Sequence, residues 1–234
     1  MNTDKHAPRL AGLMFVVVIV IGVLSGFMLT PLNYAMTGPP ENISETMINF
    51  SDNPTMVQLS IVGFLIEAVA IVLLTVSLYT TLKKQNKIIA RWAFGLWIIE
   101  AVAIALREIN AFSLLYAGQE FVKAGAPDSS YFQTLGSLFY KLMHFCYDVQ
   151  MVFYCIGGFL FYYLFLKSKY VPKVLSIIGL IVAFLGFIGE LFAIFGYDVP
   201  LYVFLPILPF ELAIGLWLMI MGIRDGSETG KKIV

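Results

Sequence analysis

The stretch IVGFLIEAVAIVLLTVSLYTTLKKQNK, residues 61–87, decides the fold class of this chain. From residue 61 to residue 82 it is apolar apart from Glu67 and a few hydroxyl-bearing side chains, and it ends in a cluster of lysines. An α-helix needs roughly 20 predominantly apolar residues to cross the hydrocarbon core of a bilayer. The stretch therefore predicts a membrane-spanning helix that ends at a basic membrane surface.

The composition of the whole chain agrees with a membrane protein. Of the 234 residues, 59% are hydrophobic and 13% are charged, and the mean hydropathy is +0.86. Soluble domains average roughly 45–50% apolar and about 25% charged residues. The lipid bilayer is therefore the expected partner of most of the surface. The formal net charge is zero, which gives no support for a nucleic-acid partner.

Six apolar runs are long enough to cross a membrane. They cover approximately residues 10–32, 56–82, 89–117, 138–166, 174–197 and 201–223. The first run is longer than the roughly 7–15 residues of a signal-peptide core and lacks a small-x-small cleavage site, so we interpret it as a retained helix. We expect an all-α polytopic membrane protein, with one six-helix bundle formed by residues 1–234. Oligomers of this bundle are possible.

Basic residues predict how the bundle is oriented. Twelve of them flank the spans on one side: Lys5, Arg9, Lys83, Lys84, Lys87, Arg91, Lys167, Lys169, Lys173, Arg224, Lys231 and Lys232. The loops on the other side contain only Lys123. Because cytoplasmic loops carry an excess of lysine and arginine, both termini are predicted to be cytoplasmic. We expect the protein in the plasma membrane.

Two segments on the predicted outer side are unusual. The expected loop 33–55 is acidic and contains N-x-S sequons at Asn42 and Asn49, which matter only in a pathway that glycosylates. A helix over residues 131–167 would be about 55 Å long at 1.5 Å per residue, whereas the hydrocarbon core is about 30 Å thick. We expect this helix either to project from the membrane or to break near its outer end.

Nine ionisable side chains fall within the predicted spans, and all nine are candidate ligand-binding residues. They are Glu67, Glu100, Arg107, Glu108, Lys141, His144, Asp148, Glu190 and Glu211. A charge near the bilayer centre costs at least about 2.5–3.5 kcal/mol on insertion scales. These side chains should therefore face the bundle interior or a polar cavity. We expect the cavity to open outward, with Lys141 and His144 on its rim.

The segment YKLMHFCYDVQ, residues 140–150, concentrates several of these groups. Lys141, His144 and Asp148 are three and four residues apart, which places them on one helix face. A neighbouring stripe of tyrosines follows with a period of seven: Tyr140, Tyr147 and Tyr154. Their hydroxyl groups could donate hydrogen bonds to the carboxylates.

The last predicted span contains a break signal, FLPILPFE at residues 204–211. Pro206 and Pro209 remove two backbone donors, which frees two carbonyl groups in the preceding turn. Interrupted membrane helices occur where neighbouring groups or a cavity satisfy the backbone again, and such breaks often mark binding sites. The segment is therefore either a packing kink or part of a site close to Glu211.

Three functional interpretations follow from the charged residues. The first is a cavity that binds or transports a small polar or cationic ligand, or relays protons. The second is an intramembrane enzyme acting on a lipid or small apolar substrate, with a divalent metal as a possible cofactor held by His144, Asp148 and Glu211. The third is a structural or regulatory subunit in which buried ion pairs fix helix register.

Four stretches resemble a bacterial family of six-helix membrane proteins known as domain of unknown function 4386. They are RLAGLMFVVVIVIGV at 9–23, LYTTLKKQNK at 78–87, LKSKYVPKVLSIIGL at 166–180 and PFELAIGLWLMIMGI at 209–223. Together they follow the chain in order over nearly its whole length. The resemblance implies an integral membrane protein, and it implies no activity, cofactor or catalytic residue.

Overall fold

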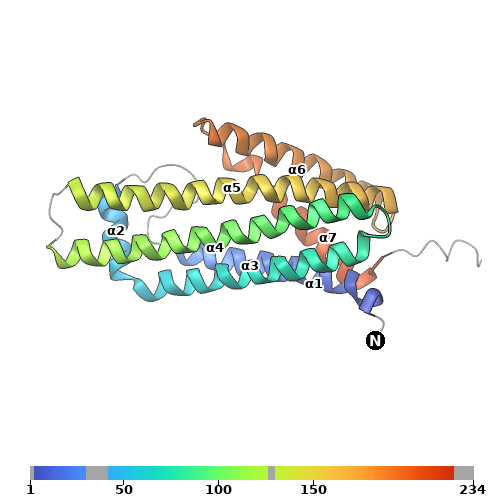
Figure 1. Ribbon diagram of the computed structural model, residues 1–234, viewed down its shortest axis with the longest axis horizontal. Helices are drawn as coiled ribbons and strands as arrows, with labels where there is room; N and C mark the ends of the chain where they lie inside the picture. Colours follow the sequence, from blue (N-terminus) through green and yellow to red (C-terminus); the bar gives the residue numbers. More distant parts are fainter. Residues whose placement is uncertain (1–2, 30–41, 126–129, 224–234) are drawn as a thin grey trace, which may run out of the picture.

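The computed structural model shown in Figure 1 describes residues 3–29, 42–125 and 130–223, and the regular structure of these residues is helical. The α-helices are α1 Thr3–Leu29, α2 Ile43–Asp52, α3 Pro54–Leu82, α4 Lys87–Lys123, α5 Ser130–Ser168, α6 Lys173–Ile194 and α7 Ile207–Met221, with a short 3₁₀ turn at Leu201–Val203. Five of the described helices, α1, α3, α4, α5 and α6, are long and apolar enough to cross a membrane. This finding indicates a multi-pass membrane protein.

The long helices run beside one another along the longest axis of the molecule (Figure 1). The start of α1, the α3–α4 turn and the α5–α6 turn lie at one end of the bundle, and α2 lies at the other. The basic residues Lys83, Lys84 and Lys169 therefore occupy the same end as the start of α1.

The predicted span 201–223 begins later in the structure. Leu201–Val203 is a 3₁₀ turn, and the α-helix α7 starts only at Ile207, whose backbone N–H donates to Phe204 O at 3.0 Å. Pro206 directly precedes the helix, and its ring would not fit the interior of a longer one. The α-helix thus begins within the predicted break segment 204–211, six residues after the approximate start of the apolar run. At 15 residues, α7 is about 22 Å long and shorter than the other apolar helices.

The expected loop 33–55 contains the helix α2, which the sequence analysis did not predict. Asn42 caps it, because its Oδ1 accepts hydrogen bonds from Ser44 N at 3.1 Å and Glu45 N at 3.4 Å. Asparagine followed by glutamate three residues later resembles a capping box. The sequence therefore carried a signal for this helix start. The residues 33–41 lie outside the described part of the chain.

The far end of the bundle is held by α2 against α4 and α5. Met47 and Phe50 of α2 are fully buried, and a Cβ at Gly118 of α4 would lie only 2.5 Å from Met47 O. Helix α5 is continuous over 39 residues, about 58 Å. The helix is therefore unbroken, and the predicted alternative of a break near its outer end is wrong.

Helices α1 and α7 meet most closely at two glycines. A Cβ on Gly12 would overlap the backbone of Met219 and would lie 2.6 Å from Gly215 O, and a Cβ on Gly215 would lie 2.8 Å from Phe15 Cβ. Small residues allow helix backbones to approach closely within membranes. This crossing fixes α7 against α1 near the start of α1.

We expect Gly12→Ala to lower the thermal unfolding midpoint of the purified protein. The added methyl group would overlap backbone atoms, which cannot move aside by a change of rotamer. Overpacking of this kind typically lowers the free energy of unfolding by about 1–3 kcal/mol. Gly95→Ala is the matched control, because a Cβ there meets no described atom within 4 Å beyond its own helix. An equal loss of stability in both variants would contradict the glycine contact.

Candidate ligand-binding cavity

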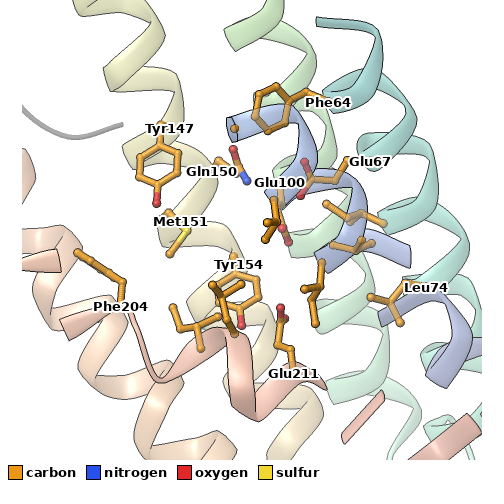
Figure 2. Close-up of a pocket in the computed structure, with 18 of the residues that line it drawn as sticks. Phe64, Glu67, Leu74, Glu100, Tyr147, Gln150, Met151, Tyr154, Phe204 and Glu211 are labelled. Atoms are coloured by element: carbon orange, nitrogen blue, oxygen red, sulfur yellow. The ribbon is translucent and has the colours of Figure 1, made fainter. Parts of the chain in front are cut away.

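A cavity of about 490 Å³ lies between α1, α3, α4, α5 and the start of α7. Most of its lining is aliphatic or aromatic, and Figure 2 shows side chains from several helices turned towards it. The polar and charged lining residues are Glu67, Glu100, Arg107, Tyr147, Gln150, Tyr154 and Glu211. An apolar pocket of this size with a few converging polar groups is typical of small-molecule sites.

Three carboxyl groups from three helices converge on this cavity. Glu67 comes from α3, Glu100 from α4 and Glu211 from α7, and their side chains point towards the same space (Figure 2). Each of the three carboxyl groups lies close enough to at least one of the others to interact with it electrostatically. Glu100 and Glu211 are buried, so this acidic group is enclosed by the bundle.

The Glu67 carboxyl group packs against a glycine of α1, and only a residue without a side chain leaves space for it there. A Cβ on Gly22 would lie 2.8 Å from Glu67 Oε1 and 3.3 Å from Oε2. A larger side chain on this face of α1 would therefore displace the carboxyl group. Gly22 itself lines the cavity, so the site is shaped by α1 although this helix contributes no charge to it.

Glu100 has hydrogen-bonding capacity that the described residues do not use. Its side chain is 4% exposed, and its Oε2 is buried without a hydrogen-bond partner among the described residues. A buried polar atom without a partner costs roughly 1–3 kcal/mol, and more for a charged group. Because Glu100 lines the cavity, its carboxyl group has capacity there to bind a donor or a cation.

Glu211 and Tyr154 are joined by a side-chain hydrogen bond. The Tyr154 backbone is held in turn by Trp97, whose Nε1–H donates to Tyr154 O at 3.0 Å. The Trp97 ring lies nearly parallel to the Tyr154 ring at 6.1 Å and meets Phe161 edge-on at 4.9 Å. The Tyr154 hydroxyl thus lies next to a carboxyl group, the arrangement expected for a tyrosine of this stripe.

Arg107 is held by groups from three helices. Its Nε pairs with Glu108 Oε1 at 2.8 Å, and its Nη1 donates to Gln150 Oε1 on α5 at 3.1 Å. The guanidinium lies 4.1 Å from the centre of the Phe64 ring on α3, a cation–π contact. Arg107 and Glu108 are both buried. This cluster ties α3, α4 and α5 together at one edge of the cavity.

The other predicted site residues lie elsewhere. Asp148 on α5 and Glu190 on α6 face each other closely enough to interact electrostatically, and Glu190 is 1% exposed. Lys141 is exposed, and the ring of the half-buried His144 lies 4.5 Å from the Tyr140 ring. The structure does not bring these four residues to the lining of the cavity.

The suggested metal ligands His144, Asp148 and Glu211 do not gather into one site. Within residues 3–29, 42–125 and 130–223, no group of three or more histidine, cysteine, aspartate and glutamate side chains could hold a metal ion. Cys146 and Cys155 are free thiols.

The chain matches the family described as domain of unknown function DUF4386 over residues 10–222. The chain belongs to this family. The match confirms the resemblance seen in the sequence. No curated protein and no solved structure matches the chain, so the site in this DUF4386 member is interpreted from its own geometry.

Sequence reasoning missed three contributors to the site. Gln150 was detectable, since an amide in an apolar span needs a partner. Trp97 gave no comparable signal, because aromatic residues are common throughout such helices. Gly22 could be recognised only once its closeness to Glu67 was known.

We expect Glu108→Gln to lower the thermal unfolding midpoint strongly. Removing one partner of a buried ion pair typically costs about 3–5 kcal/mol, because the remaining charge is left uncompensated. Glu120→Gln is the control on the same helix, since Glu120 forms an exposed ion pair with Lys123 at 2.7 Å, and exposed pairs contribute little. Similar midpoints for the two variants would show that Arg107 does not depend on Glu108.

Proposed function

We propose that this membrane protein binds a small ligand carrying a positive charge in the cavity between α1, α3, α4, α5 and α7. The observation that supports the proposal most is the convergence of Glu67, Glu100 and Glu211 on one largely apolar cavity. Carboxylates in an apolar environment are costly unless they are paired or protonated. A bound cation would provide the missing partner.

The charges around the cavity leave an acidic surplus. Arg107 is engaged by Glu108, and this pair is neutral as a unit. The three remaining carboxyl groups then face a space in which no lysine or further arginine is among the lining residues. The Arg107 cluster thus agrees with the interpretation that buried ion pairs hold the helices in register. The three carboxyl groups agree with the interpretation that the cavity binds a ligand.

The same carboxyls support a second activity, the exchange of protons for the ligand. The Tyr154 hydroxyl beside Glu211 offers a neutral donor next to the site, and a protonated carboxyl that binds a cation would release its proton when the cation arrives. Ligand transport coupled to protons therefore fits this cavity better than metal-dependent catalysis.

For the membrane arrangement, we infer six crossings, with both termini at the cytoplasmic face of the plasma membrane and one bundle over residues 1–234. The basic turns at one end of the bundle support the orientation. Helix α7 supports the sixth crossing, since it returns to the start of α1 at the Gly12–Gly215 contact. In this orientation the cavity lies towards the outer half of α1.

We expect the protein in lipid nanodiscs to bind tritiated decyltrimethylammonium, and Glu100→Gln and Glu211→Gln each to weaken binding. A charged contact is worth roughly 1.5–3 kcal/mol, so the affinity should fall roughly ten- to a hundredfold. The measurement is equilibrium binding, with empty nanodiscs as background.

Two controls make this measurement specific. Glu120→Gln removes a carboxylate far from the cavity and should bind as the native protein does. Decylsulfonate has a similar chain with the opposite charge and should not compete. The proposed cation site is wrong if decylsulfonate competes equally, or if both carboxyl variants retain native affinity.

A further inference from the structure

The cavity opens on one side of the bundle. Three of its lining residues are themselves exposed: Phe27 on α1 is 68% exposed, Leu205 53% and Leu208 44%. Since a lining residue that is also exposed marks the edge of an opening, the mouth lies between α1 and the segment that leads into α7.

The mouth follows from how α1 and α7 diverge. They touch at Gly12 and Gly215, and from there Phe27 is about 22 Å along α1 and Leu208 about 10 Å along α7. The first residue of α7 is Ile207, directly before Leu208. The helix α7 therefore cannot follow α1 any further towards Phe27. The two elements close the cavity at the Gly12 end and leave it open at the Phe27 end.

Both edges of the mouth come from uncharged sequence. No charged residue occurs between Arg9 and Glu41, or between Asp198 and Glu211. A surface of this kind is suited to the hydrocarbon part of a bilayer, where charged side chains are expensive. The mouth therefore fits an opening to lipid better than an opening to water.

The carboxyl groups lie deeper in the protein than the apolar side chains at the mouth. Glu211 lies only one turn beyond Leu208 along α7, yet it is 7% exposed. Glu100 Oε2, which has no hydrogen-bond partner among the described residues, is buried as well. A molecule that spans from the carboxyls to the mouth meets acidic groups at one end and apolar side chains at the other.

We propose that the ligand is a single-chain amphiphile with a cationic head, which reaches the cavity from the bilayer through the gap between Phe27 and Leu205–Leu208. Its head contacts Glu67, Glu100 and Glu211, and its chain passes out between α1 and α7 into the lipid. This inference rests on the proposed cation site, and it adds the class of ligand and the route.

The first test is a chain-length series of alkyltrimethylammonium ions, from tetramethylammonium to hexadecyltrimethylammonium, bound to the native protein in nanodiscs. If the alkyl chain stays in lipid, the affinity calculated from the free concentration in water should rise by about fourfold for each methylene added beyond hexyl. This rise should continue up to the longest chain of the series. A cavity closed to lipid would instead give a cut-off, where longer chains no longer fit.

The second test narrows the mouth. Leu208→Trp should slow the binding of decyltrimethylammonium and weaken it by at least about tenfold, while binding of tetramethylammonium stays within about twofold of native. Leu212→Trp is the matched control, because Leu212 is similarly exposed, at 40%, on the same helix but does not line the cavity. Leu212→Trp should leave the affinity for both ligands unchanged.

The outcomes separate the two proposals. If tetramethylammonium and the longer ions bind and respond to Glu100→Gln, but a chain-length cut-off appears, the cation site stands and entry from lipid is wrong. If no ion of the series binds, the cation site itself is wrong. The chain-length result uses the native protein, so it decides the route even if Leu208→Trp fails to fold.

Discussion

The bundle depends on one constraint: in lipid, charged and polar groups must find their partners inside the protein. Glu100, Arg107, Glu108 and Glu211 are all buried, and they come from α4 and α7. Glu100, Arg107 and Glu211 line one cavity together with Glu67 of α3, and Glu108 lies beside it as the ion-pair partner of Arg107. The apolar helices can vary in their lipid-facing residues, but this meeting point fixes how α3, α4, α5 and α7 face one another.

Within that meeting point, the charges divide into two groups with different consequences. Arg107 pairs with Glu108 and contacts Gln150 and the Phe64 ring, so it links helices α3, α4 and α5. Among the carboxyls of Glu67, Glu100 and Glu211, Glu67 lies within range of the Arg107 charge, but Arg107 already forms its ion pair with Glu108. On the proposed cation site, a bound cation would complete this enclosed acidic group, and the stability of the bundle would then rise with ligand binding.

The sequence predicted the class of fold well, because long apolar runs and basic turns are local signals. It placed the start of the last span too early, since the α-helix begins only after Pro206, and it missed α2, whose amphipathic pattern is short. The face with Lys141 and His144 was a reasonable candidate from spacing alone. Which side of α5 meets the cavity depends on the packing of α4, α6 and α7 around it, and helical spacing cannot show that. Glu67, Glu100 and Glu211 were identified individually, but their convergence required the structure.

The most direct test of the cation site is a crystal structure with decyltrimethylarsonium, in which arsenic replaces the nitrogen of the ammonium head. Arsenic scatters anomalously, so an anomalous difference map shows where the head lies. The account predicts one peak among the carboxyls of Glu67, Glu100 and Glu211, with the chain directed towards Phe27. A peak between Asp148 and Glu190, with the cavity empty, would contradict it.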